Sequence, residues 1–248
     1  MPLTHQIFVT VSAAVCFFPL SSLAQKRVAD RPQPKLEKFW SRTFAHQKRE
    51  LASKRADICF VGDSLTEFWT STGKAIWELE FHDLHAVNFG IAADRTENIL
   101  YRLTHADIAS NPPRVFVLLA GTNNLSNEPP DSPETTVSAI EAIINYITKQ
   151  CPESKILVLN LPPNGYDPDS ALRKRVIQTN RQLSKLTLPD HVTSLDIYSV
   201  FTDSSHRWKR GMTIDGTHFS QRGYDYLSRA LAPTIKALKS ESKGRTGD

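Results

Sequence analysis

Glycine and cysteine are scarce in this chain. Its 248 residues include ten glycines and three cysteines, while 40% are hydrophobic and 23% are charged. A collagen-like repeat, a low-complexity disordered chain and a small disulfide-stapled scaffold each need a different composition, so these classes are excluded. A chain of this length and apolar content can bury a single large core. We therefore expect one globular domain, in which each glycine position is informative.

An excess of basic over acidic residues is confined to one segment. Residues 25–55 contain ten Lys or Arg against three Asp or Glu, whereas the whole chain has a net charge of +4, so the remainder is slightly acidic. A nucleic-acid-binding protein would carry a basic recognition surface and a reading motif. Neither is visible, and we expect no nucleic-acid partner. We interpret residues 25–36 as a solvated basic leader in preference to a membrane or polyanion contact.

Charge is absent from the first 24 residues. The apolar run at residues 7–20 is too short to span a bilayer as a helix, and small residues including Ala24 follow it. We predict that residues 1–24 are a signal peptide, that the mature protein is secreted or periplasmic, and that it has no stable membrane span. An uncleaved N-terminal anchor is the alternative, because the residues before the apolar run include His5 but no Lys or Arg.

The cysteines lack the spacing of a metal site. Cys59 lies in an apolar run of strand length, and Cys151 is the other cysteine beyond the first 24 residues. Export would permit a disulfide, but the setting of Cys59 favours two free thiols. No His and Cys cluster has zinc-ligand spacing, so we expect no bound metal and no cofactor.

The body of the chain alternates between two kinds of segment. Short runs rich in Val, Ile, Leu and Phe are typical of parallel strands buried on both faces, and segments with apolar residues at helical spacing separate them. The alternation predicts an α/β fold with three layers, α/β/α. We expect strands at residues 57–62, 84–90, 114–121, 155–161 and 192–197, and helices at residues 96–103, 133–150, 170–186 and 221–239.

Polar segments follow the predicted strands or lie in a late loop, and each contains one of the scarce glycines. In open α/β sheets the active site lies beyond the carboxyl ends of the strands, where these segments are expected to meet. The segments are Gly62-Asp63-Ser64-Leu65, Asn88-Phe89-Gly90, Gly121-Thr122-Asn123-Asn124 and Asp215-Gly216-Thr217-His218.

In this order and spacing, these segments resemble the four sequence blocks of the SGNH (GDSL) hydrolases, and within that family the catalytic subunits of platelet-activating-factor acetylhydrolase. The resemblance implies a hydrolase domain at residues 37–240, followed by a C-terminal tail at residues 241–248. It also implies a flavodoxin-like sheet of five parallel strands in the order 2-1-3-4-5. A lone Gly-Asp-Ser-Leu would be weak support, because any turn can supply it; four blocks at strand ends are specific.

A serine hydroxyl needs a neighbouring base to become a nucleophile. Ser64 is the candidate nucleophile, and His218 is the candidate base because a neutral imidazole takes up a proton near pH 7. Asp215 stands three residues earlier, where a local turn brings its carboxylate to the other ring nitrogen. Alone, this pair would be better explained as a capping carboxylate and a surface histidine. The pair Asp203 and His206 has the same spacing but no family match, and we expect loop residues there.

Ester hydrolysis also needs donors for the oxyanion. The resemblance assigns this role to the backbone N–H groups of Ser64 and Gly90 and to the side-chain amide of Asn123. In the implied strand order these residues end three adjacent strands, about 4.8 Å apart. Glycine at position 90 is expected because a side chain there would obstruct the approach of substrate. The alternatives are that Gly90 merely ends a strand and that Asn123 merely caps a turn.

Other residues near these segments bear on the shape of the turn and on the choice of substrate. Asp63 is expected to hold the nucleophile turn. Ala92 and Ala93 stand where the acetylhydrolase-like sequence pattern tends to have glycines. Their methyl groups are expected to narrow the cavity beside Gly90. The turn lacks the last glycine of a G-x-S-x-G elbow, which argues against an α/β-hydrolase lipase. The glycosylation sequon at Asn124 is interpreted as coincidental. Aromatic residues that line the site or pack within the fold are Phe68, Trp69, Tyr166 and Trp208.

We therefore expect a serine esterase that hydrolyses a small, acetyl-like carboxylic ester through an acyl-enzyme. An acetylated carbohydrate is the expected substrate because export favours it. The alternative that the resemblance favours is a platelet-activating-factor-like lipid or a lysophospholipid. A third hypothesis, from a different class, is a catalytically idle glycan-binding module that has kept the fold.

Overall fold

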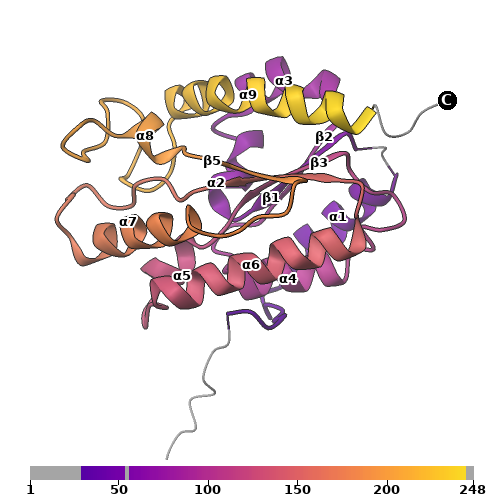
Figure 1. Cartoon of the computed structure of the whole chain (residues 1–248), viewed down its shortest axis with the longest axis horizontal. Coiled ribbons are helices and arrows are strands. Elements are labelled where there is room, and N and C mark those ends of the chain that lie inside the picture. The colour runs from indigo at the N-terminus through magenta and orange to yellow at the C-terminus, as the bar shows by residue number, and fades with distance from the viewer. Residues whose placement is uncertain (1–28, 54–55, 244–248) are drawn as a thin grey trace, which may run out of the picture.

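A computed structural model describes residues 29–53 and 56–243 (Figure 1). The predicted signal peptide lies outside these residues, as do the first four residues of the basic leader. Five strands form one parallel sheet in the order β2-β1-β3-β4-β5, which confirms the predicted order. The strands are β1 (Ile58–Gly62), β2 (Ala86–Gly90), β3 (Val115–Leu119), β4 (Lys155–Leu159) and β5 (Val192–Leu195).

Helices cover both faces of the sheet, so the predicted three-layer α/β/α arrangement is also confirmed (Figure 1). Alternate residues of β1 explain the two layers of core: Cys59 and Val61 pack with α1, α4 and α6, whereas Ile58 and Phe60 pack with α3 and α9. The longer helices are α1 (Lys38–Ser53), α3 (Lys74–Glu80), α4 (Thr96–Thr104), α6 (Pro133–Gln150), α7 (Ala171–Leu183) and α9 (Gln221–Lys243), and the short ones are α2 (Ser64–Glu67), η1 (Phe68–Thr70), η2 (His82–Leu84), α5 (Thr122–Ser126) and α8 (Tyr198–Phe201).

Helix α6 shows how local sequence sets these boundaries. Ser132 caps its start by accepting a hydrogen bond from the backbone N–H of Thr135 at 3.1 Å, and Pro133 occupies the first turn, where its missing N–H has no consequence. Ile140 and Ile147 lie on its buried face. The helix spans the predicted residues because its caps and its apolar periodicity agree.

Elsewhere the structure departs from the expected boundaries. Helix α1 was not expected, and Trp40, Gln47 and Leu51 are its buried residues. Strand β2 begins at Ala86, two residues later than expected, since His85 has a left-handed backbone with φ of 49°. Strand β3 ends at Leu119 and precedes Gly121, whose φ is 116°. Helix α9 continues to Lys243, beyond the expected start of the tail.

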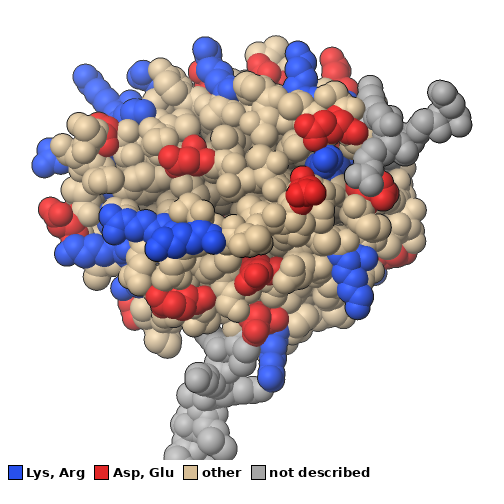
Figure 2. Space-filling model, viewed as in Figure 1, with Lys and Arg blue, Asp and Glu red and all other residues tan. Residues whose placement is uncertain are grey.

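The described part of the basic leader lies against the domain. The backbone N–H of Gln33 donates to the carbonyl of Glu97 at 3.0 Å, and the Thr96 hydroxyl donates to the carbonyl of Ala29. Residues 29–36 are therefore hydrogen-bonded to the start of α4 and are not wholly solvated. On the face shown in Figure 2, acidic and basic side chains are interspersed.

The strand register places the predicted catalytic segments at one edge of the sheet. Gly62 at the end of β1 is level with Gly90 of β2 and with Leu119 of β3. The loops that follow these strands therefore begin side by side, as the rule for open α/β sheets requires.

Candidate active site

Ser64 begins the short helix α2, directly after β1. Asp63 caps this helix, and its Oδ1 atom accepts a hydrogen bond from the backbone N–H of Leu65 at 2.9 Å. The turn is tight: a Cβ on Gly62 would lie 2.5 Å from the carbonyl oxygen of Leu119. Asp63 thus holds the nucleophile turn, as expected. By capping α2 it fixes the backbone from which the Ser64 side chain projects.

Ser64, His218 and Asp215 form a continuous hydrogen-bonded chain. The Ser64 Oγ atom lies 3.0 Å from Nε2 of His218, and Nδ1 of the same ring lies 2.6 Å from Oδ2 of Asp215. The Oδ1 atom of Asp215 accepts the backbone N–H groups of Thr217 and His218. This is the local turn that the three-residue spacing predicts, and it leaves one imidazole nitrogen facing the serine hydroxyl.

Opposing effects act on the Asp215 carboxylate. Burial by itself would raise its pKa, but the hydrogen bonds from the His218 side chain and from the backbone of His218 and Thr217 outweigh burial, so the pKa of Asp215 is lowered. The carboxylate is therefore charged at neutral pH. A charged partner fixes the tautomer of the imidazole and stabilises the imidazolium that forms when the ring takes up a proton.

The loop that carries His218 is fixed by neighbouring loops. Gly216, with φ of 88°, accepts a hydrogen bond at its carbonyl from the backbone N–H of Gly165 at 2.8 Å. The indole of Trp208 donates to the carbonyls of both glycines, and the buried Arg173 side chain donates to that of Gly165 as well. Trp208 is therefore a structural residue of this loop pair.

The rival pair Asp203 and His206 forms an ordinary turn. Oδ1 of Asp203 accepts the backbone N–H groups of Ser205 and Arg207, and the backbone N–H of His206 donates to the carbonyl of Asp203. These residues are the loop residues that the sequence predicted.

Gly90 does not present a free donor. Its backbone N–H donates to the side-chain oxygen of Asn88 at 3.0 Å. A Cβ at this position would lie 2.3 Å from the backbone nitrogen of Glu67 and 2.8 Å from the carbonyl carbon of Thr66. Glycine is needed here because α2 packs directly on the end of β2, and the expected reason, access of substrate to the backbone, does not fit this packing.

The free donor of this segment belongs to Ala93. In the turn that follows β2, the N–H of Ile91 donates to Gly62, that of Ala92 to the Glu67 carboxylate, and that of Asp94 to Ile91. Among the described residues, nothing accepts the N–H of Ala93. Ala93 also has a left-handed backbone, with φ of 60°. A strained backbone is unusual for alanine and is characteristic of functional loops.

Asn123 joins the two loops beside the serine. Its Nδ2 atom donates to the carbonyl of Asp94 at 2.9 Å and to Oδ2 of Asp63 at a longer distance of 3.3 Å. Asp63 precedes Ser64 and Asp94 follows Ala93, so the amide lies between the two backbone segments. The longer hydrogen bond, to Asp63, is the weaker of the two.

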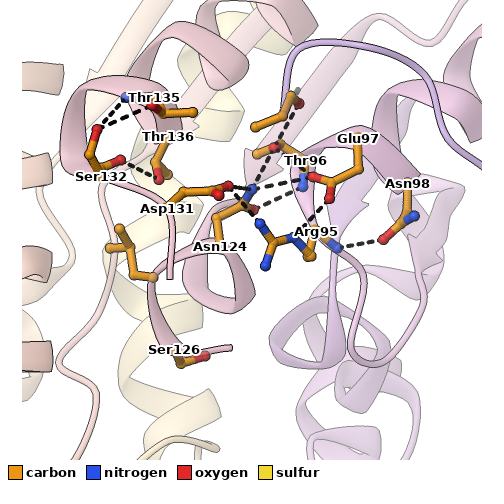
Figure 3. A network of polar contacts seen from close by, with 12 residues as sticks. Arg95, Thr96, Glu97, Asn98, Asn124, Ser126, Asp131, Ser132, Thr135 and Thr136 are labelled. Atoms are coloured by element: carbon orange, nitrogen blue, oxygen red, sulfur yellow. Dashed lines mark hydrogen bonds and ion pairs between the residues drawn. The ribbon is translucent and has the colours of Figure 1, made fainter. Parts of the chain in front are cut away.

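Asn124, which follows Asn123 in α5, belongs to a buried polar network (Figure 3). Its side chain accepts the backbone N–H of Thr96 at 3.0 Å and donates to the Asp131 carboxylate at 2.9 Å. Arg95 binds the same carboxylate at 2.6 Å and pairs with Glu97. Asn124 is fully buried, so its amide is inaccessible to a glycan, in agreement with the interpretation of its sequon as coincidental.

The candidate aromatic residues differ in position. The Phe68 ring centroid lies 5.1 Å from that of His218, so Phe68 contacts the site. Trp69 is buried in the core against Phe60 and Tyr224. Tyr166 is 61% exposed and packs against Gly216, next to Asp215.

The Asp63 carboxyl has a perturbed pKa. Complete burial raises its pKa to about 7, the nearby Asp94 adds to the increase, and the hydrogen bond from Leu65 and the charge of His218 oppose it. A titratable group with this pKa lies directly beside the nucleophile, which is a common property of active sites.

Other reactive groups lie away from the site. Cys59 and Cys151 are free and buried, and burial raises the pKa of both thiols, that of Cys151 to about 11. Within residues 29–53 and 56–243, no three His, Cys, Asp or Glu side chains could together hold a metal ion. In the same part of the chain, no helix has the length and apolarity to cross a membrane.

Residues 60–226 match the family described as GDSL-like lipase/acylhydrolase. The chain belongs to this family. Among curated proteins, human platelet-activating factor acetylhydrolase IB subunit alpha2 is 35% identical over 191 residues, which cover 76% of this chain and 80% of the relative. The human alpha1 subunit is 30% identical over 194 residues, covering 77% of this chain and 80% of the relative. Membership of the GDSL-like family confirms the expected class, an ester hydrolase.

Solved structures of GDSL-like proteins share the fold. A GDSL-like lipase from Bacteroides thetaiotaomicron superposes with a TM-score of 0.66 at 19% identity and covers 78% of this chain and 98% of its own. An acetyl xylan esterase from Geobacillus stearothermophilus gives a TM-score of 0.58 at 14% identity, with coverage of 72% and 93%. At these identities the likeness concerns the fold.

Several residues of the site were not predicted from the sequence. Asn88 and Glu67 accept the N–H groups of Gly90 and Ala92, and Arg102 contacts the ends of two strands. Asn88 stands in one of the four predicted segments, but its role as an acceptor was not predicted. No local motif marks Glu67 or Arg102, because their contacts join segments far apart in the chain. The left-handed conformation of Ala93 could have been suspected from its alignment with glycines in the related pattern.

Proposed function

We propose that this protein is a serine esterase that removes a small, acetyl-like acyl group through an acyl-enzyme. The observation that carries the proposal is the hydrogen-bonded chain from Ser64 through His218 to Asp215. His218 takes the proton of the Ser64 hydroxyl as Oγ bonds to the ester carbonyl carbon. The same proton passes to the departing alkoxide, and the alcohol leaves. Water, deprotonated by His218, then attacks the acyl-enzyme and releases the carboxylic acid and Ser64.

The negative charge on the carbonyl oxygen is stabilised by donors around Ser64. We assign them as the N–H of Ser64, the N–H of Ala93 and the amide of Asn123. Ala93 replaces Gly90 in this assignment because the Gly90 N–H is already bonded to Asn88. Such donors act strongly because they are held in place before the reaction begins.

The acyl group is proposed to be acetyl. The two human relatives, which are 35% and 30% identical, are named acetylhydrolases. Alanines at positions 92 and 93 leave less room in this loop than glycines would, which favours a short acyl chain.

For the alcohol half we propose an acetylated carbohydrate. The predicted export of the protein supports it, as does Tyr166, an exposed aromatic ring next to Asp215 on which an apolar sugar face can pack. The platelet-activating-factor acetylhydrolase relatives favour the rival, a short-acyl lipid. A catalytically idle glycan-binding module would not need the Ser64, His218 and Asp215 chain.

The decisive experiment compares the wild type with Ser64→Ala on p-nitrophenyl acetate. We expect hydrolysis and covalent labelling by a fluorophosphonate in the wild type, and neither in a variant with an unchanged circular dichroism spectrum. Retained hydrolysis in Ser64→Ala would overturn the mechanism. Purified enzyme is then assayed on acetylated xylooligosaccharides and on acetylated phospholipids of matched concentration. A preference for the lipids would replace the carbohydrate proposal.

A further inference from the structure

The Asp94 carboxylate is buried and is bound by two parts of the chain, Arg102 of α4 and the N-terminal segment that contains Lys35 and Trp40. Both Asp94 and Arg102 are 0% exposed, and Nε of Arg102 lies 2.7 Å from Oδ2 of Asp94. The indole N–H of Trp40 donates to Oδ1 at 2.7 Å, and Nζ of Lys35 lies 3.3 Å from the same atom. A buried carboxylate is tolerated only when its oxygens are paired in this way. Asp94 immediately follows Ala93, so these contacts fix one end of the loop from Gly90 to Asp94, which carries the proposed Ala93 donor.

Arg102 also binds the ends of two strands. Its Nη1 donates to the carbonyl of Phe89 at 2.8 Å and its Nη2 to the carbonyl of Gly62 at 2.9 Å. The guanidinium lies over the Phe89 ring, 4.7 Å from its centroid. One planar group therefore connects the turn before Ser64, the end of β2 and the Asp94 carboxylate. Lysine has a single ammonium group and cannot make these bonds together.

The other contacts with Asp94 come from the N-terminal segment, which precedes the family match at residues 60–226. Besides the bonds of Lys35 and Trp40 to Asp94, Gln47 of α1 donates to the carbonyl of Gly90 at 2.7 Å. Lys35 also reaches the carbonyl of Ala92 at 3.5 Å. The loop from Gly90 to Asp94 is thus held on its outer side by residues that lie outside the matched family region.

These contacts have a consequence for Ala93. Its left-handed backbone is disfavoured for an L-residue and persists only where the surroundings impose it. Nothing accepts its N–H among the described residues, so the direction of this donor depends on the bonds that its neighbours make. We propose that Lys35, Trp40 and Arg102 are positioning residues that act through Asp94 to aim the Ala93 N–H at the oxyanion.

The proposal rests on the proposed esterase function, and full-length variants test it. Trp40→Phe removes one donor and keeps a ring against Phe44 and Tyr101. Lys35→Met removes the ammonium, and Arg102→Lys keeps the charge. We expect kcat per titrated active site to fall about 10-fold to 100-fold, with KM within about threefold, because the lost donor acts in the transition state. Inactivation by a phosphonate ester, which forms a tetrahedral oxyanion, should slow in parallel.

Control variants separate positioning from stability. Lys48→Met changes an exposed lysine on α1. Arg114→Lys weakens the ion pair with Asp57 at the opposite ends of the strands. We expect unchanged kcat in both, even where Arg114→Lys lowers Tm. If kcat fell as much in these controls as in Trp40→Phe, the loss of activity would reflect general destabilisation of the protein. That result would overturn the proposal.

Hydrogen exchange gives a readout that does not depend on esterase activity. We expect the peptide containing Ala93 to exchange faster in Trp40→Phe and Lys35→Met than in the wild type, while peptides of β3 and β4 stay unchanged. Normal kcat together with unchanged exchange in both variants would overturn the proposal, whatever the folding of Arg102→Lys. If the wild type hydrolyses no ester, the proposed function fails, and the exchange rates alone decide whether these residues hold the loop.

Discussion

The Nε2 atom of His218 lies 3.0 Å from the Oγ atom of Ser64, although 154 positions separate the two residues. The fold brings them together by attaching helix α9 to α2. The fully buried Tyr224, at the start of α9, donates its hydroxyl to the carbonyl of Leu65 at 2.9 Å. The loop that carries His218 leads directly into α9, so this hydrogen bond connects the base to the helix that begins with the nucleophile.

Tyr224→Phe tests this connection. Removing the hydroxyl leaves the carbonyl of Leu65 without its donor and keeps the ring packed against Trp69. We expect the free energy of unfolding to fall by about 1 kcal/mol, and kcat to fall several-fold with KM unchanged. Urea unfolding and steady-state kinetics measure the two effects. An unchanged kcat despite the loss of stability would show that the arrangement of Ser64, His218 and Asp215 does not depend on this hydrogen bond.

Gly90→Ala tests the packing of α2 on β2. The added Cβ would meet backbone atoms of Glu67 and Thr66, which have no flexible end that could move aside. We expect destabilisation of about 3 kcal/mol and a fall in kcat of at least tenfold, because α2 carries Ser64. The matched control is Gly211→Ala, where a Cβ finds its nearest neighbour at 3.7 Å but φ is 79°. That variant should lose about 1–2 kcal/mol and keep its kcat.

Substitutions of Ala93 test whether its backbone, and not its side chain, acts in catalysis. Ala93→Gly keeps the N–H and relieves the left-handed strain, so we expect kcat within about threefold of the wild type and a Tm that is equal or higher. Ala93→Val adds a β-branched side chain at φ of 60° and should displace the loop, lowering kcat more than tenfold. Equal kcat in the two variants would argue that the Ala93 N–H does not contact the oxyanion.

Asp63 predicts a pH dependence of stability. Its pKa is raised from 3.8 to about 7 in the folded protein, so the folded state keeps a proton that the unfolded chain has lost. The stability contribution is complete below about pH 4 and falls as the pH rises towards 7, with a slope of up to about 1.4 kcal/mol per pH unit. Above pH 7 it stays constant at its lower value.

Asp63→Asn isolates this contribution. Asparagine can still accept the N–H of Leu65 but does not titrate. We expect the difference in unfolding free energy between wild type and variant to change steadily from pH 5 to pH 7 and to level off above pH 7. Urea unfolding at each pH measures it. A difference that is constant from pH 5 to pH 8 would mean that Asp63 does not titrate in this range.

Much of the fold follows from local sequence. Residues buried on both faces of a parallel strand must all be apolar, so β1, β3 and β4 stand out as short hydrophobic runs. Helix α6 carries its own cap and an apolar face. Helix α1 was not predicted; it buries Trp40 and Gln47, whose side chains donate hydrogen bonds to the end of β2 and the loop after it. A role of this kind leaves no periodic signal.

The sequence by itself determined the strands, the helices α4, α6, α7 and α9 and the segments that supply Ser64, Asp215 and His218. It also placed Asp215 beside the imidazole, because a three-residue spacing within a turn brings the two side chains together. Only the tertiary structure decided which backbone N–H is free for the oxyanion. The N–H of Gly90 is taken by Asn88, and the N–H of Ala93 is left open by a loop held from α1 and α4. A donor is available or occupied according to the acceptors around it, and some of these, such as the Glu67 carboxylate that accepts the N–H of Ala92, come from distant parts of the chain.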